Sequence, residues 1–490
     1  MVATRLWLSE LHLFFRSESA RKKRSASSDS KQPTLGILAF ETARTMAQLI
    51  SLYNSLSPAQ IQTLRNVVFQ SEGIQYLNSS DEFHLIYLAF TEKIEELDRA
   101  AAAVSRLGVK CQRQDLRGFD HTYTDLKIGA VDLPGLSFTA KEIGRKIAQM
   151  EKHVLATADL YSGLESLSEM EASERKLQHW KSFSGPIPAQ KVDTEMFEEK
   201  MTWQRQHVQR MRNTSLWSQP FDDIVLLMAR FVYTVFSRIC VVFGPYVSDL
   251  PQVVSDGNVV SVAPKQVQFN PFRSGPLERS VAKDVIVTNS GPLYIKPRSG
   301  IEMFRNHEDN VGSDRKQRKR LRITEWAEPT TVGGAGLALL YATVVIRAES
   351  LLNSAGPIDA DARENLYQML PAELQTAVNV KIRKCLQCDE SWSSDKLIVE
   401  GWREALGGIL GWLAPLAHKM VTWQAERSLE QQRFDSQTTV LLLETLYFSD
   451  REKTEAAIAE VLVGLSCILR HQDRRSSTPG KRPGFKGRDC

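Results

Sequence analysis

Apolar residues recur every three or four positions over long stretches of this chain, and this spacing constrains its fold more than any other feature. The clearest stripe follows Ser79, ends at Gly108, and consists of Phe83, Ile86, Phe90, Ile94, Leu97, Ala101 and Val104. A repeat near 3.6 residues is one face of an amphipathic helix, whereas a half-buried strand alternates with period two. No convincing alternation appears, so the sequence predicts an all-α fold.

Residues that start and stop helices punctuate these stripes. Ser57 can cap a helix that begins at Pro58, and Gln60 can complete a capping box. Ser79 and Glu82 repeat this pattern before the stripe that ends at Gly108. Further helices are expected after Phe138, along a weaker stripe that includes Trp203, Val208, Met211 and Leu216, and over 221–244, 395–432 (kinked at Pro415), 436–448 and 451–471.

One long stretch interrupts the stripes. From 246 to 328, Pro, Ser, Gly, Asn and basic residues dominate, and a structureless stretch of this length is unusual inside a compact domain. We therefore expect two multi-helical units joined by a largely disordered basic linker. The expected divisions are a basic, mostly disordered leader (1–33), an N-terminal helical domain (34–245), the flexible linker (246–328), a C-terminal helical domain (329–472) and a disordered basic tail (473–490).

Cysteine use and the length of apolar runs narrow the class of protein. Six cysteines in 490 residues, without a secretory signal, indicate reduced thiols and no disulfides. Cys385 and Cys388 lack the further ligands of a zinc site, so we interpret them as helix core and expect no metal or other cofactor. No transmembrane helix is expected, because Arg230 and Arg238 interrupt the longest apolar segment.

The segment TVGGAGLALLYATVVIRAESLL, residues 331–352, has two interpretations. Gly333, Gly334 and Gly336 either cradle a phosphate at a helix start or let that helix pack closely against another. A P-loop needs Lys and then Ser or Thr after its last glycine, and a dinucleotide fingerprint needs a different glycine spacing. Apolar residues follow Gly336 instead. Close helix packing is therefore the favoured interpretation.

The predicted helix 395–432 carries His418 among tryptophans 402, 412 and 423. A general base needs a nucleophile and an orienting acid, and the sequence shows neither beside His418. We interpret His418 as a hydrogen-bonded, partly buried structural residue and the tryptophans as core. No catalytic residue is expected.

Three stretches resemble a known plant family. They are GILAFETARTMAQLISLYNSLSPAQIQTLR (36–65), the segment 331–352 together with DARENLYQMLP (361–371), and GWLAPLAHKMVTWQAERSLEQQ (411–432). The first is similar to the N-terminal domain, and the others to the C-terminal domain, of the phytosulfokine-simulator family, whose two domains have unknown function. The motif positions, which we expect to be structural, are Gly36, Phe40, Glu41, Gly333, Gly334, Gly336, Tyr341, Tyr367, Leu370, Pro371, Trp412, His418 and Trp423.

Two basic clusters are candidate nuclear-targeting segments. They are Arg21, Lys22, Lys23 and Arg24, and then Arg315, Lys316, Arg318, Lys319, Arg320 and Arg322. Acidic importin grooves bind extended Lys and Arg side chains, so an importin is a candidate partner. An anionic membrane surface is the alternative partner for these clusters, because the apolar leader LWLSELHLFF precedes the first cluster. We expect a nuclear protein, with the cytoplasm or the plasma-membrane periphery as alternatives, and Val2 excludes the N-myristoylation of some relatives.

The resemblance implies a non-enzymatic regulatory or scaffold protein that promotes plant growth in phytosulfokine-type signalling. Its partners would be other proteins, with no small-molecule substrate. The net charge of +4 gives no reason to expect specific nucleic-acid binding. The alternatives are a peripheral membrane tether or trafficking factor, and a nucleotide-binding enzyme that uses the Gly333–Gly336 turn.

Overall fold

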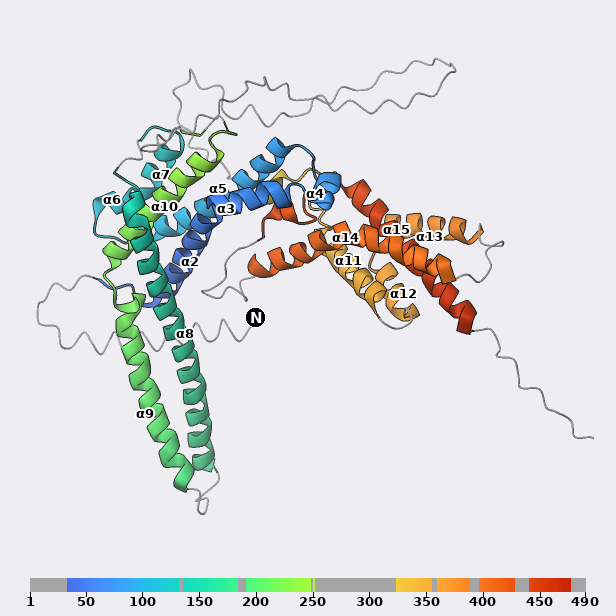
Figure 1. Ribbon diagram of the computed structural model, residues 1–490. Coiled ribbons are helices and arrows are strands. Elements are labelled where there is room, and N and C mark those ends of the chain that lie inside the picture. The colour runs from blue at the N-terminus through green and yellow to red at the C-terminus, as the bar shows by residue number, and fades with distance from the viewer. Residues whose placement is uncertain are drawn as a thin grey trace, which may run out of the picture. The chain divides into compact units, whose positions relative to one another are not determined.

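The computed structural model describes residues 33–131, 135–183, 191–247, 250–251, 323–354, 359–387, 396–427 and 440–476 (Figure 1). Within these ranges the regular structure is helical, and β pairing is limited to two isolated bridges, Thr34 with Pro220 and Thr331 with Asp450. The prediction of an all-α fold is confirmed. Most of the expected leader, linker and tail lies outside the described residues, so the expected domain boundaries remain predictions.

The helices before the long stretch pack around a buried apolar helix, α10. Neighbouring helices α2 and α5 contact it, and α8 packs on α2. Their bounds are η1 Gly36–Leu38, α2 Ala39–Ser55, α3 Pro58–Thr63, the π-helix η2 Leu64–Val68, α4 Glu72–Leu77, α5 Glu82–Gly108, α6 Gln114–Arg117, α7 Phe119–Lys127, α8 Ala140–Phe183, α9 Lys191–Thr214, η3 Leu216–Ser218 and α10 Phe221–Phe243. Four of the seven residues in the stripe that predicted α5 are buried, namely Ile86, Leu97, Ala101 and Val104, whereas Phe83 is 53% exposed.

Among the described helices, α10 is the one with the length and apolar composition of a membrane span. Within its most apolar window, 72% of the residues are buried in the protein, which is also typical of a core helix. Its two arginines bind backbone oxygens: Arg230 donates to the carbonyls of Leu136 and Ser137, and Arg238 donates to that of Leu56. These bonds satisfy both guanidinium groups inside the folded chain.

Helices α8 and α9 lie side by side as a hairpin (Figure 1). The side of α9 that faces α8 carries Met201, Gln204 and Val208, which are all buried. Gln204 donates to the carbonyl of Gly163 at 3.1 Å, and a Cβ on Gly163 would overlap the methyl group of Met211. A glycine at 163 therefore allows the two helices to approach closely.

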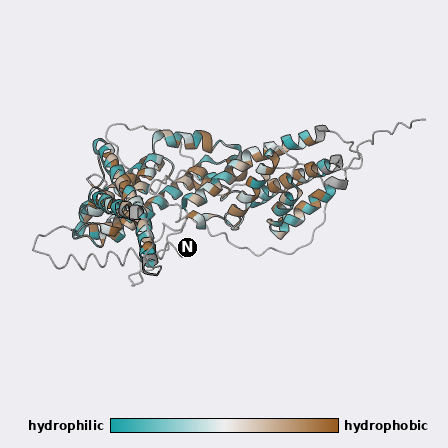
Figure 2. Ribbon diagram, turned by 90° about the horizontal axis from the view of Figure 1, so that it is seen from below, coloured by the Kyte–Doolittle hydropathy of each residue, from teal (hydrophilic) through white to brown (hydrophobic). Residues whose placement is uncertain are grey.

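The helices after the long stretch pack mainly against one another. Helix α11 lies along α14, while α13 and α14 both pack against α15. Their bounds are η4 Ile323–Trp326, α11 Ala338–Asn353, α12 Ala360–Gln368, α13 Ala372–Gln387, α14 Lys396–Arg427, η6 Leu442–Glu444 and α15 Arg451–Ser476. Pro415 lies inside α14, which continues on both sides of it. Figure 2 shows apolar and polar residues interleaved along the helices, as amphipathic faces require.

Two local predictions need correction. The cap of α5 is Asp81, which accepts from the amide of Phe83, while the Ser79 hydroxyl accepts from the amide of Asp81. The expected helix over 436–448 is wrong where the structure describes it, because residues 440–448 form only the 3-10 turn η6 and further turns. The amide of Leu442 is bonded to a side chain from the N-terminal helices instead of to a helical carbonyl. By contrast, the predicted Ser57 cap is confirmed, since its hydroxyl accepts from the amide of Gln60.

The helices on the two sides of the long stretch belong to one compact unit with one shared core. Helix α4 shows this most clearly, because it packs on α14. Gly73 lies so close to the backbone of Trp412 that a Cβ would overlap the Trp412 carbonyl oxygen. The carbonyl of Leu77 accepts from the amide of Asp450 at 2.7 Å. Residues from early and late in the chain therefore stabilise each other directly.

Candidate functional site

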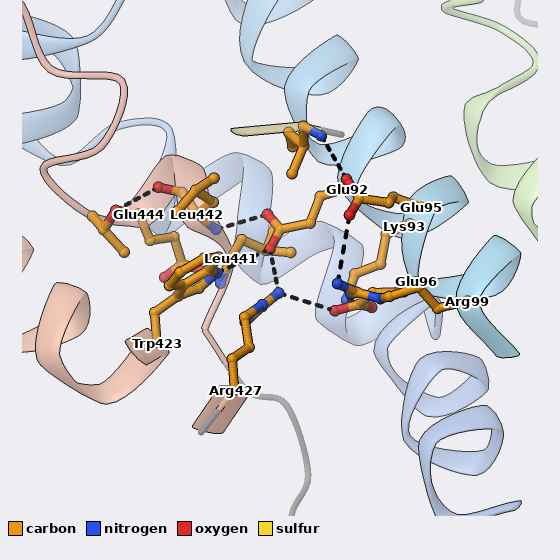
Figure 3. Close-up of polar contacts among 12 residues, drawn as sticks. Glu92, Lys93, Glu95, Glu96, Arg99, Trp423, Arg427, Leu441, Leu442 and Glu444 are labelled. Carbon is orange, nitrogen blue, oxygen red and sulfur yellow. Dashed lines mark hydrogen bonds and ion pairs between the residues drawn. The ribbon is translucent and has the colours of Figure 1, made fainter. Parts of the chain in front are cut away.

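Three carboxylates on one turn of α5 hold three elements from the C-terminal half of the chain. We call this cluster, made of Glu92, Glu95 and Glu96, the acidic clamp (Figure 3). Because residues three and four apart share a helix face, the sequence EKIEE at 92–96 presents its acids towards neighbouring elements. The clamp reaches η4, the end of α14 and the start of η6.

Glu92 is the centre of the acidic clamp and is only 1% exposed. One carboxylate oxygen accepts from the guanidinium of Arg427 at 2.8 Å and from the indole Nε1 of Trp423 at 3.3 Å. The other accepts from the backbone amide of Leu442 at 2.7 Å. Charge-assisted bonds of this kind are the strongest in proteins, and a buried carboxylate needs them to offset its lost hydration.

The outer members of the clamp extend the network. Glu95 accepts from the amide of Ile323 at 2.6 Å, which fixes the first residue of η4 against α5. Glu96 lies 3.1 Å from Lys93 and 3.5 Å from Arg427. Arg427 therefore bridges two carboxylates of α5. The central carbon of its guanidinium also lies 4.1 Å from the centre of the Trp423 ring, as in a cation–π contact.

The electrostatics of Glu92 follow from its burial. Burial raises the pKa of the Glu92 carboxyl from 4.5 to about 7, and the negative charge of Glu96 is the second cause of this rise. Arg427, Lys93 and the Leu442 amide oppose this rise because they favour the ionised form. The result is a buried group that gains or loses its charge near neutral pH.

Two regions of the chain match known families; the first ends within α5 just after Glu92, and the second ends within α14 before Trp423 and Arg427. Residues 37–93 match a domain of unknown function (DUF3475), and residues 331–422 match a protein of unknown function (DUF668). The chain is 26% identical over 459 residues to Protein PSK SIMULATOR 1 of Arabidopsis thaliana, which covers 91% of this chain and 57% of the relative. Protein PSK SIMULATOR 3 of the same plant is 24% identical over 451 residues, covering 90% of this chain and 57% of the relative.

This chain is a distant homologue of the PSK simulator proteins over about 90% of its length. It spans just over half the length of the two curated relatives above. No solved structure matches it. The resemblance expected from the three sequence stretches is confirmed.

In this homologue of the PSK simulator proteins, the glycines of the motif at 331–352 form a turn before helix α11, which begins at Ala338. A Cβ on Gly333 would overlap Tyr447, and one on Gly334 would overlap the carbonyl oxygen of Glu328. Gly336 has a φ of +74°, and a Cβ there would meet nothing within 4 Å. The expected close approach thus holds for two glycines, but they approach loop residues and not a helix. For Gly336 the packing interpretation is wrong, because its backbone conformation is what favours glycine.

The motif tyrosines anchor buried polar contacts. Tyr341 is fully buried on α11 and donates to Glu455 on α15 at 2.7 Å. Tyr367 on α12 donates to the carbonyl of Gln375 on α13 at 3.0 Å. Between those two helices, Leu370 is buried and Pro371 is partly buried. These residues tie α11, α12, α13 and α15 together, which is a structural role.

The three motif residues of α14 have different environments. Trp412 is partly buried and makes an edge contact with Tyr76 of α4, with ring centres 5.3 Å apart. Trp423 is buried and belongs to the Glu92 network. His418 is hydrogen-bonded as expected, through Nε2 to Glu349 at 2.6 Å, but its side chain is 54% exposed. The expected partial burial of His418 is therefore wrong.

The first motif lies at the start of α2. Gly36 has a φ of +55°, which accounts for glycine in the turn η1. Phe40 contacts the Trp217 ring edge-on with centres 6.0 Å apart, and Glu41 pairs with Arg106 of α5 at 2.7 Å. Each has a packing role in the described structure.

No group of His, Cys, Asp and Glu suited to a metal ion occurs among the residues that the structure describes. The side chains of Cys385 and Cys388 and both basic clusters lie outside that part of the chain. No sequence pattern predicted the acidic clamp. Its residues are ordinary solvent-face residues in a helical sequence, and its partners lie 331 to 350 positions away from Glu92.

Proposed function

We propose that this protein is a non-enzymatic regulatory or scaffold protein that promotes plant growth, acting in phytosulfokine-type signalling. Similarity to proteins named PSK SIMULATOR over about 90% of the chain supports the pathway. The observation that carries the scaffold role is the acidic clamp. Its most buried carboxylate uses both oxygens to join distant segments into one body, and a scaffold needs a fixed relation between its surfaces.

One pocket among the described residues is lined partly by polar groups that have a role in the fold. This pocket of about 350 Å³ is lined by Lys146, His153 and Arg230 among others. Arg230 stacks 4.3 Å from the centre of the Phe138 ring and bonds to two carbonyls, so its charge serves the fold.

We further propose that the protein acts in the nucleus, with import through an importin that binds the basic clusters. The support is sequence alone: Arg21–Arg24 and 315–322 are runs of Lys and Arg beside polar segments. Imaging of a tagged full chain tests this. We expect nuclear signal that is lost when Arg315, Lys316, Arg318, Lys319 and Arg320 are replaced by Ala, and plasma-membrane signal would favour the tether alternative.

Growth of Arabidopsis thaliana seedlings that express the chain tests the regulatory role. We expect longer roots than in vector controls, and a larger response to added phytosulfokine. The matched control is Glu92→Ala, which should accumulate poorly because the clamp is lost. Unchanged growth at a verified protein level would contradict the proposal.

A thermal-shift titration tests the non-enzymatic part. A ligand that binds only the folded state raises Tm increasingly as its concentration exceeds its dissociation constant. We expect no change in Tm with ATP, GTP or inorganic phosphate. A saturable rise that disappears in Gly334→Ala would instead support the nucleotide-binding alternative.

A further inference from the structure

Helix α9 carries an apolar and charged stripe that the rest of the described chain leaves uncovered. The stripe contains Met196, Glu199, Trp203, His207 and Arg210, which lie three or four residues apart on one side of the helix. The side of α9 that contacts α8 is occupied by other residues, including Met201 and Val208. Trp203 was expected on one weak apolar stripe with Val208, but Trp203 is exposed and Val208 is buried, so the two residues lie on different sides of α9.

The anchor of this stripe is large and exposed. Trp203 is 54% exposed and Met196 is 66% exposed. The Trp203 ring stacks on His207, with ring centres 4.9 Å apart and an interplanar angle of 11°. This contact holds the indole flat against the helix surface. Tryptophans presented in this way are the side chains that most often carry the binding energy of protein interfaces.

The charges on the stripe are arranged in order along the helix. Glu199 precedes Trp203 and Arg210 follows it, and neither forms an ion pair within the described residues. Arg205, on the other flank of α9, is already paired with Glu171 and Glu174 of α8. The open stripe is therefore acidic on one side of Trp203 and basic on the other.

We propose that this stripe is a dimer interface, in which α9 pairs antiparallel with α9 of a second copy of this chain about a two-fold axis at Trp203. In an antiparallel pair, residues equally far before and after the centre face each other. Glu199 then faces His207 of the second copy and lies within one turn of its Arg210. Met196 packs on the aliphatic stem of that Arg210, and the two Trp203 rings meet at the axis.

The order of the charges along α9 favours a second copy of this helix in the antiparallel orientation. A two-fold axis brings each acidic segment against a basic one twice, whereas a parallel pair would place Glu199 beside Glu199 and Arg210 beside Arg210. Helix α9 has 24 residues, so the pair is about 36 Å long at 1.5 Å per residue. One helix pair of this length is a small interface, and we expect a reversible dimer in the micromolar range. This inference is independent of the proposed signalling role.

Sedimentation velocity of the full chain across the micromolar range tests the interface. The wild type should change from monomer to dimer with increasing concentration. Trp203→Ala should raise the dimer dissociation constant at least about ten-fold, because it removes the central aromatic anchor. Leu155→Ala is the matched control, since Leu155 is 63% exposed on the same hairpin but lies outside the stripe, and it should leave dimerisation unchanged.

Charge reversal tests the antiparallel geometry. Glu199→Arg and Arg210→Glu should each weaken the dimer, because each places like charges together at both ends. The double variant should restore much of the affinity, because the order of charges is then inverted as a whole. Circular dichroism of each variant should match the wild type. A monomer at every concentration, or a dimer that Trp203→Ala or the charge reversals leave unchanged, would overturn the proposal.

Discussion

The guanidinium of Arg427 donates to the carboxylate of Glu92 at 2.8 Å, although 335 positions separate the two residues in the chain. Both side chains are largely removed from water, with exposures of 18% and 1%. Removing either partner from a pair buried to this degree strongly destabilises the fold, because the other charge is then left unpaired in a poorly hydrated site.

Glu92→Ala should therefore lower the free energy of unfolding by about 3 to 5 kcal/mol, the range for breaking one side of a buried ion pair. The substitution also leaves the Leu442 amide and the Trp423 indole without their acceptor. Urea unfolding measures the change. Arg65→Ala is the control, because its pair with Glu82 is over 40% exposed on both sides and should contribute about 1 kcal/mol or less. Equal losses in the two variants would contradict the role of burial.

The raised pKa of Glu92 predicts a stability that falls as pH increases. Because the pKa is 4.5 when exposed and about 7 in the folded state, the native protein binds more protons than the unfolded chain between these values. The contribution of Glu92 to the unfolding free energy thus decreases from pH 4.5 to 7 and is constant above. Glu92→Gln cannot titrate. The stability difference between wild type and Glu92→Gln, measured by urea unfolding, should decrease across this window, and a difference independent of pH would exclude the shift.

The glycine turn before α11 predicts an order of stability losses. Gly336→Ala and Gly336→Leu should cost a similar amount, about 1 to 2 kcal/mol, because the strain comes from the positive φ and the surrounding space is open. Gly333→Ala and Gly334→Ala should cost more than Gly336→Ala, since their Cβ atoms would overlap Tyr447 and the Glu328 carbonyl. Thermal unfolding ranks the four variants. A much larger loss for Gly336→Leu than for Gly336→Ala would show that packing, and not φ, governs this position.

Tyr341→Phe should lower stability by about 1 kcal/mol, the usual net value of one hydrogen bond, because it removes the bond to Glu455 and keeps the buried ring. The loss is limited because Arg451 still pairs with Glu455 at 2.6 Å. His418→Ala provides the comparison at an exposed pair, and it should change stability by less than Tyr341→Ala. Urea unfolding of Tyr341→Phe, Tyr341→Ala and His418→Ala measures the loss of stability in each variant.

The sequence predicted the elements that local patterns determine. The stripe from Phe83 to Val104 gave helix α5 and its end at Gly108, and Ser57 capped the helix that it was expected to cap. Such signals act within one or two helical turns. The same stripe gave no indication of the clamp, because a carboxylate such as Glu92 on the polar side of a helix is usually solvated.

Two of the incorrect predictions share a physical cause. Residues 440–448 are apolar enough for a helix, but the Leu442 amide bonds to Glu92 and the chain turns there. Trp203 appears on a weak apolar stripe, yet the side of α9 that faces α8 is set by Gln204 and its bond to Gly163. In both places a contact between segments distant in sequence decides the outcome, and no local pattern records it.

The position of Gly73 has a consequence for how this chain can change by mutation. A side chain at 73 would strike a methyl group of Leu416 and also the backbone carbonyl oxygen of Trp412, which every amino acid carries. No exchange of side chains within 331–422 can therefore make room for a larger residue in α4. A substitution at Gly73 can therefore be suppressed only by a change that moves the backbone of α14 away from α4.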